Sequence, residues 1–267
     1  MRPTAVRLDV HKILQHAHLS IPGHAADYVR VGHVQDAIVR QFLDFKKSSS
    51  SSLSGQPRPI VLTMEFTPVY TFGRRQIHNE ESVGKIAQLK RIAPEAQAVY
   101  AQRGGQTTFH GPGQLVAYPI IDITNYNLTS KCYVRKLEQA AIELLALYGL
   151  QAKTTENTGV WLSNHEKIAS IGVHLRRHVT SHGIAINATT DLAYFANIVA
   201  CGLPFSKPAS ISSHAPDAWN NMITHAPGHD GLRHLSNQFV NIFAQHLGFD
   251  GIEIVDYANI KNQFGEI

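Results

Sequence analysis

The chain has 267 residues, of which 43% are hydrophobic and 16% are charged. This is an ordinary globular composition, and no apolar run approaches the roughly 20 residues that a membrane-spanning helix needs, so a soluble protein is expected. The net charge of +4 is not gathered into a basic run. This distribution argues against nucleic acid, but it fits an acidic protein partner or an anionic substrate.

The first predicted element is a helix over about residues 26–45, where apolar side chains recur at helical spacing. A Ser-rich polar stretch over residues 46–59 follows, and such a composition cannot pack a core. The segment before this stretch is too small to fold alone. We therefore expect a surface loop inserted into a single domain over residues 1–267, rather than a domain boundary.

Strands dominate the middle of the chain and helices flank them. The fold class this order predicts is α+β, with a mixed sheet covered on one face by helices. An amphipathic helix precedes Gly149, which is expected to cap it. Strands are predicted over residues 60–65, 69–72, 99–102, 115–123 and 180–187. A hairpin over residues 159–177 turns at 163–166. The other helices are predicted over residues 80–92, 133–148 and 231–247.

A glycine-rich stretch over residues 103–118 is the first candidate site, and it reads R-G-G-Q-T-T-F-H-G-P-G-Q-L-V-A-Y. Glycine at this density lets a ligand approach the backbone. A phosphate-binding loop would need Lys and Ser or Thr after its second glycine, and a dinucleotide fingerprint would open a helix. Here Gly111 precedes proline and Gly113 opens a strand. Neither nucleotide motif fits.

Metal chemistry is the second possibility, because the chain has 16 histidines. His165 and Glu166 do not continue into the H-E-x-x-H motif, and no Cys and His pair has zinc-finger spacing. We expect neither a metal nor a cofactor, and most of these histidines are expected to be surface or structural residues.

A cysteine nucleophile is the third possibility, and the chain has two cysteines. Two cysteines make no disulfide framework, so a reducing compartment and at least one free thiol are expected. Cys201 ends an apolar segment broken by Gly202 and Pro204, where a buried structural cysteine is the ordinary interpretation. Cys132 precedes a helix whose positive end favours a thiolate. Local sequence alone does not choose between them.

Lys167 begins an apolar strand. Period-two alternation places it on the same face as Ala169, Ile171 and Val173. Such a lysine either extends to solvent along its aliphatic stem or is held inside as a general base. A cysteine nucleophile beside a lysine base would form an acyl-transfer pair.

Four blocks of the sequence together resemble one family. The run over 103–118 is similar to the signature of the lipoyl(octanoyl) transferases. K-I-A-S-I-G-V-H-L-R-R over 167–177, T-S-H-G-I-A-I-N over 180–187 and A-C-G-L over 200–203 match the remaining blocks of that family in order. The resemblance covers roughly residues 60–245.

The resemblance implies the fold of the biotin and lipoate protein ligases. It also implies transfer of an octanoyl group from acyl carrier protein to a lysine of a lipoyl domain in 2-oxoacid dehydrogenases or the glycine cleavage H protein. Cys201 would carry the acyl group as a thioester and Lys167 would be the base, while Cys132 lies outside the motifs. The implied acyl site comprises Arg103, Gly104, Gly105, Gln106, Thr107, Thr108, Phe109, His110, Ser170, Ile171, Gly172, Gly183, Ile184 and Ala185.

One position departs from the family, because Phe66 stands where a histidine usually lies, two residues before Pro68. Eukaryotic members of the family are mitochondrial. Residues 1–12 have spaced basic residues but include Asp9 and lack an apolar core, so they do not form a secretory signal and are a weak transit-peptide candidate. We expect a mitochondrial or otherwise cytoplasmic monomer. The alternatives are an ATP-dependent lipoate or biotin ligase, which needs no cysteine, and a non-catalytic binding protein.

Overall fold

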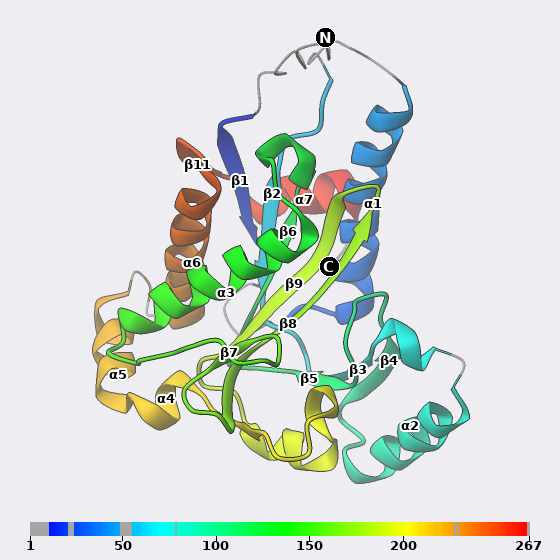
Figure 1. Cartoon of the computed structure of the whole chain (residues 1–267), viewed down its shortest axis with the longest axis vertical. Coiled ribbons are helices and arrows are strands. Elements are labelled where there is room, and N and C mark those ends of the chain that lie inside the picture. Colours follow the sequence, from blue (N-terminus) through cyan, green and yellow to red (C-terminus); the bar gives the residue numbers. More distant parts are fainter. Residues whose placement is uncertain are drawn as a thin grey trace.

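The computed structural model describes residues 11–20, 24–48, 55–77, 79–226, 228 and 230–265. Its centre is an eight-stranded sheet with both parallel and antiparallel pairs, as the sequence predicts (Figure 1). The strand order is β10 (Lys207–Pro208), β8 (Glu166–Arg176), β9 (Val179–Asn187), β6 (Gln114–Ile120), β2 (Ile60–Met64), β1 (Ile13–His18) and β11 (Gly251–Ile254), and β7 (Val160–Trp161) pairs with β8. A second sheet has the order β4 (Gln97–Tyr100), β3 (Val69–Phe72) and β5 (Thr108–His110).

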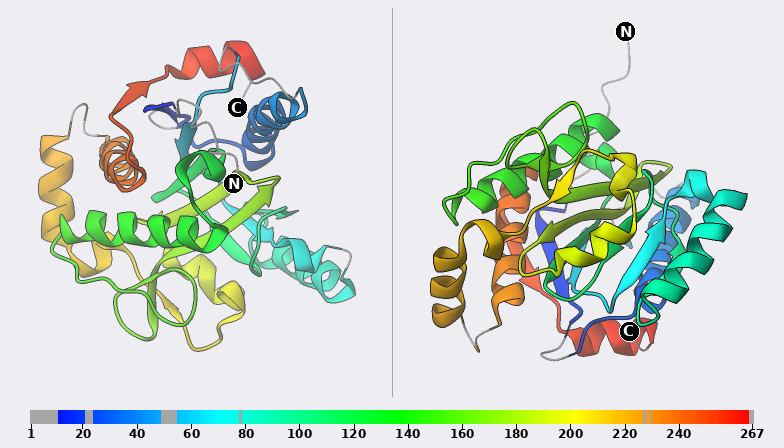
Figure 2. Two further views of the ribbon diagram at one scale, coloured as in Figure 1. Left: turned by 45° about the horizontal axis from the view of Figure 1, so that its top comes forward. Right: turned by 90° about the horizontal axis from the view of Figure 1, so that it is seen from below.

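Helices cover both faces of the large sheet, so the expectation of one covered face is wrong (Figure 2). Leu115 and Ala117 on β6 pack into the core beneath α3 (Ser130–Ala146) and α6 (Gly231–Leu247). The alternate residues Val116 and Tyr118 face the core beneath α1 (Tyr28–Lys47) and α7 (Tyr257–Phe264). Every residue of β6 is buried, because this central strand must be apolar on both sides.

The remaining helices lie at the edges of the sheets. α2 (Glu80–Ile92) flanks the three-stranded sheet, and α4 (Ile211–His214) and α5 (Pro216–His225) precede α6. Short 3-10 helices occur at η1 (Arg74–Gln76), η2 (Ile123–Tyr126), η3 (Leu192–Asn197) and η4 (Ala200–Gly202). Within the described residues, no helix has the length and apolar character to cross a membrane.

The predicted helices over 80–92 and 231–247 coincide with α2 and α6. The hairpin is present as β7 and β8, and Gly149 follows α3 with a φ of +73°. The loop predicted over 46–59 begins later than expected, because α1 includes Lys46 and Lys47. Residues 49–54 of that loop lie outside the described residues.

The end of α1 is fastened to the sheet by Lys46. Its Nζ donates to the buried Asp122 carboxylate at 2.5 Å and to the Arg177 carbonyl oxygen at 2.7 Å. Asp122 Oδ1 also accepts from the Thr124 hydroxyl at 2.7 Å. The pair therefore links α1, the end of β6 and the β8–β9 turn.

Candidate active site

A cavity of about 150 Å³ lies where β6, β8 and β9 meet the glycine-rich loop and the turn at Cys201. It brings together Cys201, Lys167 and most of the predicted acyl-site residues, which come from three separate segments of the sequence. The predicted residues that line it are Arg103, Gly105, Gln106, Thr108, His110, Ser170, Ile171, Gly172, Gly183, Ile184 and Ala185.

Three predicted residues do not line this cavity. Strand alternation turns Phe109 away from Thr108 and His110, and Phe109 packs between Tyr70 and Tyr194 instead. The Gly104 N–H donates to the Val173 carbonyl oxygen at 3.0 Å, so it is not available to a ligand. Thr107 faces away from the cavity, but its carbonyl oxygen holds the Cys201 segment, as described below.

Arg103 organises the glycine-rich loop. Its buried guanidinium donates to the Thr71 hydroxyl and carbonyl oxygens at 2.6 and 2.7 Å, and to the carbonyl oxygens of Gly104 and Gln106 at 3.0 and 2.9 Å. All these acceptors are uncharged. The guanidinium is therefore fully hydrogen-bonded, and no carboxylate in the described part of the chain forms an ion pair with it.

Glycines allow the loop to lie against its neighbours. A Cβ on Gly172 would lie 2.9 Å from Arg103 Cδ and 3.0 Å from the Gly104 oxygen. A Cβ on Gly73 would lie 2.0 Å from the Gly105 oxygen. The loop is therefore packed between β8 and the residue after β3, where side chains would displace it.

Lys167 faces the cavity, and the expectation that it shares the face of Ala169 is wrong. The register between β7 and β8 shifts, so that Val160 pairs with Ala169 while Trp161 pairs with Lys167. Ile168 and Ala169 both belong to the core beneath α3 and α6. This β-bulge inverts the alternation, and Lys167 joins Ser170 and Gly172 on the cavity side.

The Lys167 side chain is 8% exposed, and its Nζ lies 5.2 Å from the centre of the Trp161 ring. A Cβ on Gly159 would lie 2.5 Å from Lys167 Cε, so this glycine provides the space for the lysine stem. Among the described residues, no carboxylate forms an ion pair with this amine.

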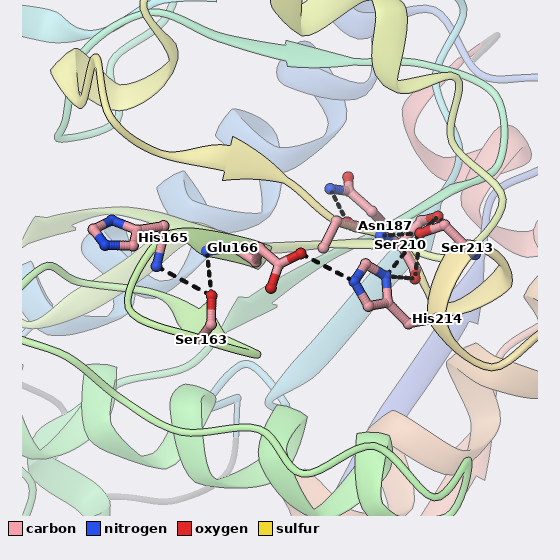
Figure 3. A network of polar contacts seen from close by, with 8 residues as sticks. Ser163, His165, Glu166, Asn187, Ser210, Ser213 and His214 are labelled. Atoms are coloured by element: carbon pink, nitrogen blue, oxygen red, sulfur yellow. Dashed lines mark hydrogen bonds and ion pairs between the residues drawn. The ribbon is translucent and has the colours of Figure 1, made fainter.

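A polar network supports the start of β8 from the outer side (Figure 3). His214 Nε2 lies 3.3 Å from Glu166 Oε1, and its Nδ1 lies 2.9 Å from the Ser213 hydroxyl. The neighbouring Ala209 N–H donates to the Lys167 carbonyl oxygen at 2.9 Å. These contacts hold residues 207–214 against β8 and so position the backbone of Lys167.

Cys201 lies in a short turn with an unusual backbone. Its φ is +55°, a left-handed conformation that is uncommon for residues other than glycine. The Cys201 N–H donates to the Thr107 carbonyl oxygen at 2.8 Å, and the thiol sulfur lies 3.8 Å from the Ser170 hydroxyl. Strained backbone of this kind is concentrated at functional sites, which makes Cys201 the stronger nucleophile candidate.

Two neutral imidazoles line the cavity. Burial, with a smaller contribution from the nearby Arg103 charge, lowers the pKa of His110 to about 3, although the Gln114 hydrogen bond opposes the shift. Burial also lowers the pKa of His182 to about 3, again with a contribution from Arg103. Neither ring is protonated near pH 7. These two rings therefore add no charge to the cavity wall, which leaves their surface open to an apolar group.

Comparison with known proteins identifies the family. Residues 39–225 match the model of the lipoyl protein ligase A/B catalytic domain. The chain belongs to this family. A relative from Schizosaccharomyces pombe named as a probable octanoyltransferase is 48% identical over 66% of this chain and 76% of its own length. The mitochondrial octanoyltransferase of Kluyveromyces lactis is 39% identical over 77% of this chain and 64% of its own length.

A Danio rerio relative is named mitochondrial octanoyl-(acyl carrier protein):protein N-octanoyltransferase, and it is 38% identical over 67% of this chain and 74% of its own length. These names show that this chain, a member of the lipoyl protein ligase A/B family, is an acyltransferase that transfers octanoyl groups. They also agree with the expected mitochondrial location. The chain spans less than two thirds of the Kluyveromyces lactis relative.

Solved structures show the same fold in lipoate ligases, as the resemblance implies. Lipoate-protein ligase A bound with ATP superposes with a TM-score of 0.58 over 96% of this chain and 94% of its own, at 13% identity. A chain from the structure of a bi-partite lipoate protein ligase and its E2 lipoyl domain from Thermoplasma acidophilum gives 0.57 over 95% and 91%, at 15% identity. This likeness shows that the chain has the fold of the lipoate ligases. Its chemistry follows from the residues that line the cavity.

The second cysteine of this acyltransferase, Cys132, lies away from the cavity. It is exposed at the start of α3, where hydrogen bonds from the Thr129 side chain and backbone lower the pKa of its thiol. Phe66, which replaces the usual histidine, is buried against Tyr28 and His110, with ring centres 5.0 and 6.0 Å away. It packs behind the cavity and does not line it.

Sequence reasoning missed several residues of the cavity wall. Alternation along β6 could have identified Val116 and Tyr118, since they face the side opposite to Leu115. The others come from irregular segments or from a strand position with an unusual backbone, and no local pattern marks them. These further lining residues are Asn157, Thr158, His182 and Leu203.

The described residues contain no group of three or more His, Cys, Asp or Glu side chains arranged to hold a metal ion.

Proposed function

We propose that this chain transfers an octanoyl group from the phosphopantetheine thioester of acyl carrier protein to a lysine of a lipoyl domain, through a thioester on Cys201. The observation that carries this proposal is that Cys201 and Lys167 line one cavity, which two uncharged imidazoles also line. The name of the Danio rerio relative, which includes both acyl carrier protein and a protein acceptor, supports the same donor and acceptor classes.

In the first half-reaction, the Lys167 amine takes the proton of the Cys201 thiol, and the thiolate attacks the thioester carbonyl of the donor. The new carbon–sulfur bond forms on Cys201 as the bond to the phosphopantetheine sulfur breaks. The Lys167 ammonium then returns its proton to the leaving thiolate. One thioester replaces another, so the step needs no nucleotide.

In the second half-reaction, the amine of the acceptor lysine attacks the Cys201 thioester. Lys167 removes a proton from the attacking nitrogen and delivers it to the departing Cys201 sulfur, which restores the thiol. The product amide is more stable than the thioester, and this difference drives transfer forward. The same lysine therefore acts as base and acid in both halves of the cycle.

Charge that develops on the carbonyl oxygen during both attacks would be stabilised by the site. Arg103 lines the same cavity, and its positive charge would attract negative charge that develops on that oxygen. The Gly104 N–H already donates to the Val173 carbonyl oxygen, so any backbone N–H that the glycine-rich loop donates to this oxygen must belong to a later residue of the loop.

The partners are macromolecules, and the surface beside Cys201 suits them. Val199 and Phe205, on either side of the nucleophile, are 52% and 64% exposed. The net charge of +4 would favour approach of an acidic carrier protein. We further propose lipoyl domains of 2-oxoacid dehydrogenases and the glycine cleavage H protein as acceptors, and a monomeric enzyme organised as a single domain with the Ser-rich insertion.

The ATP-dependent ligase is the alternative on this fold, and the experiment separates the two. The protein is mixed with octanoyl-acyl carrier protein, and in parallel with octanoate and ATP, and intact mass and peptide mapping locate any adduct. We expect an octanoyl thioester on Cys201 with the carrier protein only. Cys132→Ser is the matched control and should acylate normally. A label on Cys132, or activity only with ATP, contradicts the proposal.

The base is tested by Lys167→Met, with Lys207→Met on the adjacent strand β10 as control. Removing a general base typically slows the chemical step by about 10²–10⁴-fold. We expect that loss for Lys167→Met in Cys201 acylation, with an unchanged melting temperature, and near-normal rates for the control. Equal rates for Lys167→Met and the native protein would show that the lysine has no part in the reaction.

A further inference from the structure

A second cavity, of about 520 Å³, lies behind the first and is bounded by α1, β4 and the β8–β9 hairpin. Its walls include Tyr28 and Tyr100 as well as the ion pair between Arg176 and Asp36, whose atoms lie 2.8 Å apart. The two cavities have one lining residue in common, His182. This imidazole therefore lies at the boundary between them.

The position of His182 is fixed by its backbone. Its φ is +56°, which interrupts the regular alternation of β9, and its N–H donates to the buried Gln35 Oε1 at 2.6 Å. The imidazole is 7% exposed and meets the Tyr118 ring edge-on at 5.2 Å. Its Nδ1 is buried and has no hydrogen-bond partner in the described part of the chain. Packing and backbone geometry, rather than polar side-chain contacts, hold the ring in place.

The strand register gives the spacing along β8 between the residue beside the nucleophile and the residue that pairs with His182. Cys201 Sγ lies beside Ser170, at 3.8 Å from its hydroxyl, and His182 pairs with Val173, three positions further along β8. Three strand residues span about 10 Å. An extended alkyl chain advances about 1.25 Å per C–C bond at ordinary bond lengths and angles, so the eight carbons of an octanoyl group span about 9 Å.

The chemistry of His182 agrees with this placement. Burial holds the pKa of its imidazole far below neutrality, so the ring is uncharged where the end of an alkyl chain would lie. Gly172 and Gly183 form the neighbouring strand pair on the side of Ser170, and both line the cavity between the nucleophile and the ring.

From this geometry we infer that His182 is the chain-length determinant of the enzyme. Its imidazole, packed against Tyr118 on a backbone that Gln35 fixes, closes the acyl cavity at the depth of an eight-carbon chain and separates it from the second cavity. This inference rests on the proposed function, because it takes Cys201 as the attachment point of the acyl group. Longer chains would have to displace the ring to reach the space beyond it.

The test compares the native protein with His182→Gly and His182→Asn, two residues that tolerate a left-handed backbone. His174→Ala is the matched control, since His174 lines only the second cavity. Rates of Cys201 acylation by octanoyl- and dodecanoyl-acyl carrier protein are measured by intact mass. Binding of free octanoate and dodecanoate is measured by titration calorimetry.

We expect the native protein to prefer octanoyl over dodecanoyl at least tenfold. In His182→Gly the dodecanoyl-to-octanoyl rate ratio should rise about tenfold, the scale on which a pocket resolves a methylene. His182→Asn should show a smaller rise and His174→Ala none. Equal rates for both chains in the native protein, or an unchanged ratio in a folded His182 variant, would overturn the inference.

The two measurements distinguish the inference from the function on which it rests. If no variant acylates Cys201 but dodecanoate binding improves relative to octanoate in His182→Gly, the end wall is supported and the thioester chemistry fails. If Cys201 acylates with octanoyl but neither ratio responds to His182, the chemistry is supported and the wall is rejected. An equal affinity of the native protein for both carboxylates also rejects the wall.

Discussion

Lowering the pH from 7 to 5 should remove much of the stability of this fold, because three buried histidines resist protonation. Burial lowers the pKa of His16, His110 and His182 to about 3 in each case, whereas a histidine in an unfolded chain titrates near 6.5. Between these values the unfolded chain binds more protons, so the free energy of unfolding falls as the pH falls. The loss at pH 5 is about 2 kcal/mol for each histidine and about 6 kcal/mol for the three.

Urea unfolding followed by circular dichroism at pH 7 and pH 5 measures this loss. Most carboxylates titrate below pH 5, so the interval isolates the histidines. His16→Gln is the control, because His16 lies outside the cavity and its ring hydrogen-bonds Thr63 Oγ1, at 2.7 Å. Its pH-dependent loss should be about 2 kcal/mol smaller than that of the native protein. A native loss below about 2 kcal/mol, or the same loss in the variant, would refute the argument.

Two further predictions concern single contacts. Gly172→Ala should displace the glycine-rich loop, lower the free energy of unfolding by about 1–3 kcal/mol and slow acylation, whereas Gly104→Ala, whose Cβ would meet only a carbonyl oxygen at 3.4 Å, should be nearly neutral in urea unfolding. Lys46→Met should cost about 3–5 kcal/mol because it leaves the buried Asp122 charge unpaired, while Lys47→Met, which removes an exposed pair, should change the unfolding midpoint little.

The long helices and central strands were predictable because their patterns are local. α2 and α6 begin and end where the sequence places them. β1 was not predicted, because I-L-Q-H-A-H contains two histidines and has no clean alternation. It becomes a strand through parallel pairing with β2 and β11, and both histidines bond the Thr63 hydroxyl, at 2.7 and 2.9 Å. Pairing of this kind joins segments that are far apart in the sequence, and the pattern of neither segment alone predicts it.

In the site, too, some features follow from local sequence patterns and others depend on distant partners. The segments that meet at the cavity were identified from their residues, but the orientation of individual side chains depends on long-range partners. The bulge that turns Lys167 into the cavity is set by pairing with β7. The left-handed backbone of His182 is held by Gln35 on α1, which lies 147 residues earlier in the chain. Neither could be read from the strand's own pattern.

The glycine-rich loop and the nucleophile turn behave as one unit, which explains why residues that never face the cavity belong to the site. The Thr107 carbonyl oxygen holds the Cys201 N–H, and the Thr107 hydroxyl is itself held by Gln76 at 3.0 Å. A Cβ on Gly202 would lie 2.4 Å from the Gln106 amide oxygen, so this glycine allows the two segments to touch. A shift of the loop must therefore move the nucleophile as well. Gly202 therefore serves the geometry of Cys201 by admitting the Gln106 side chain, although it does not itself line the cavity.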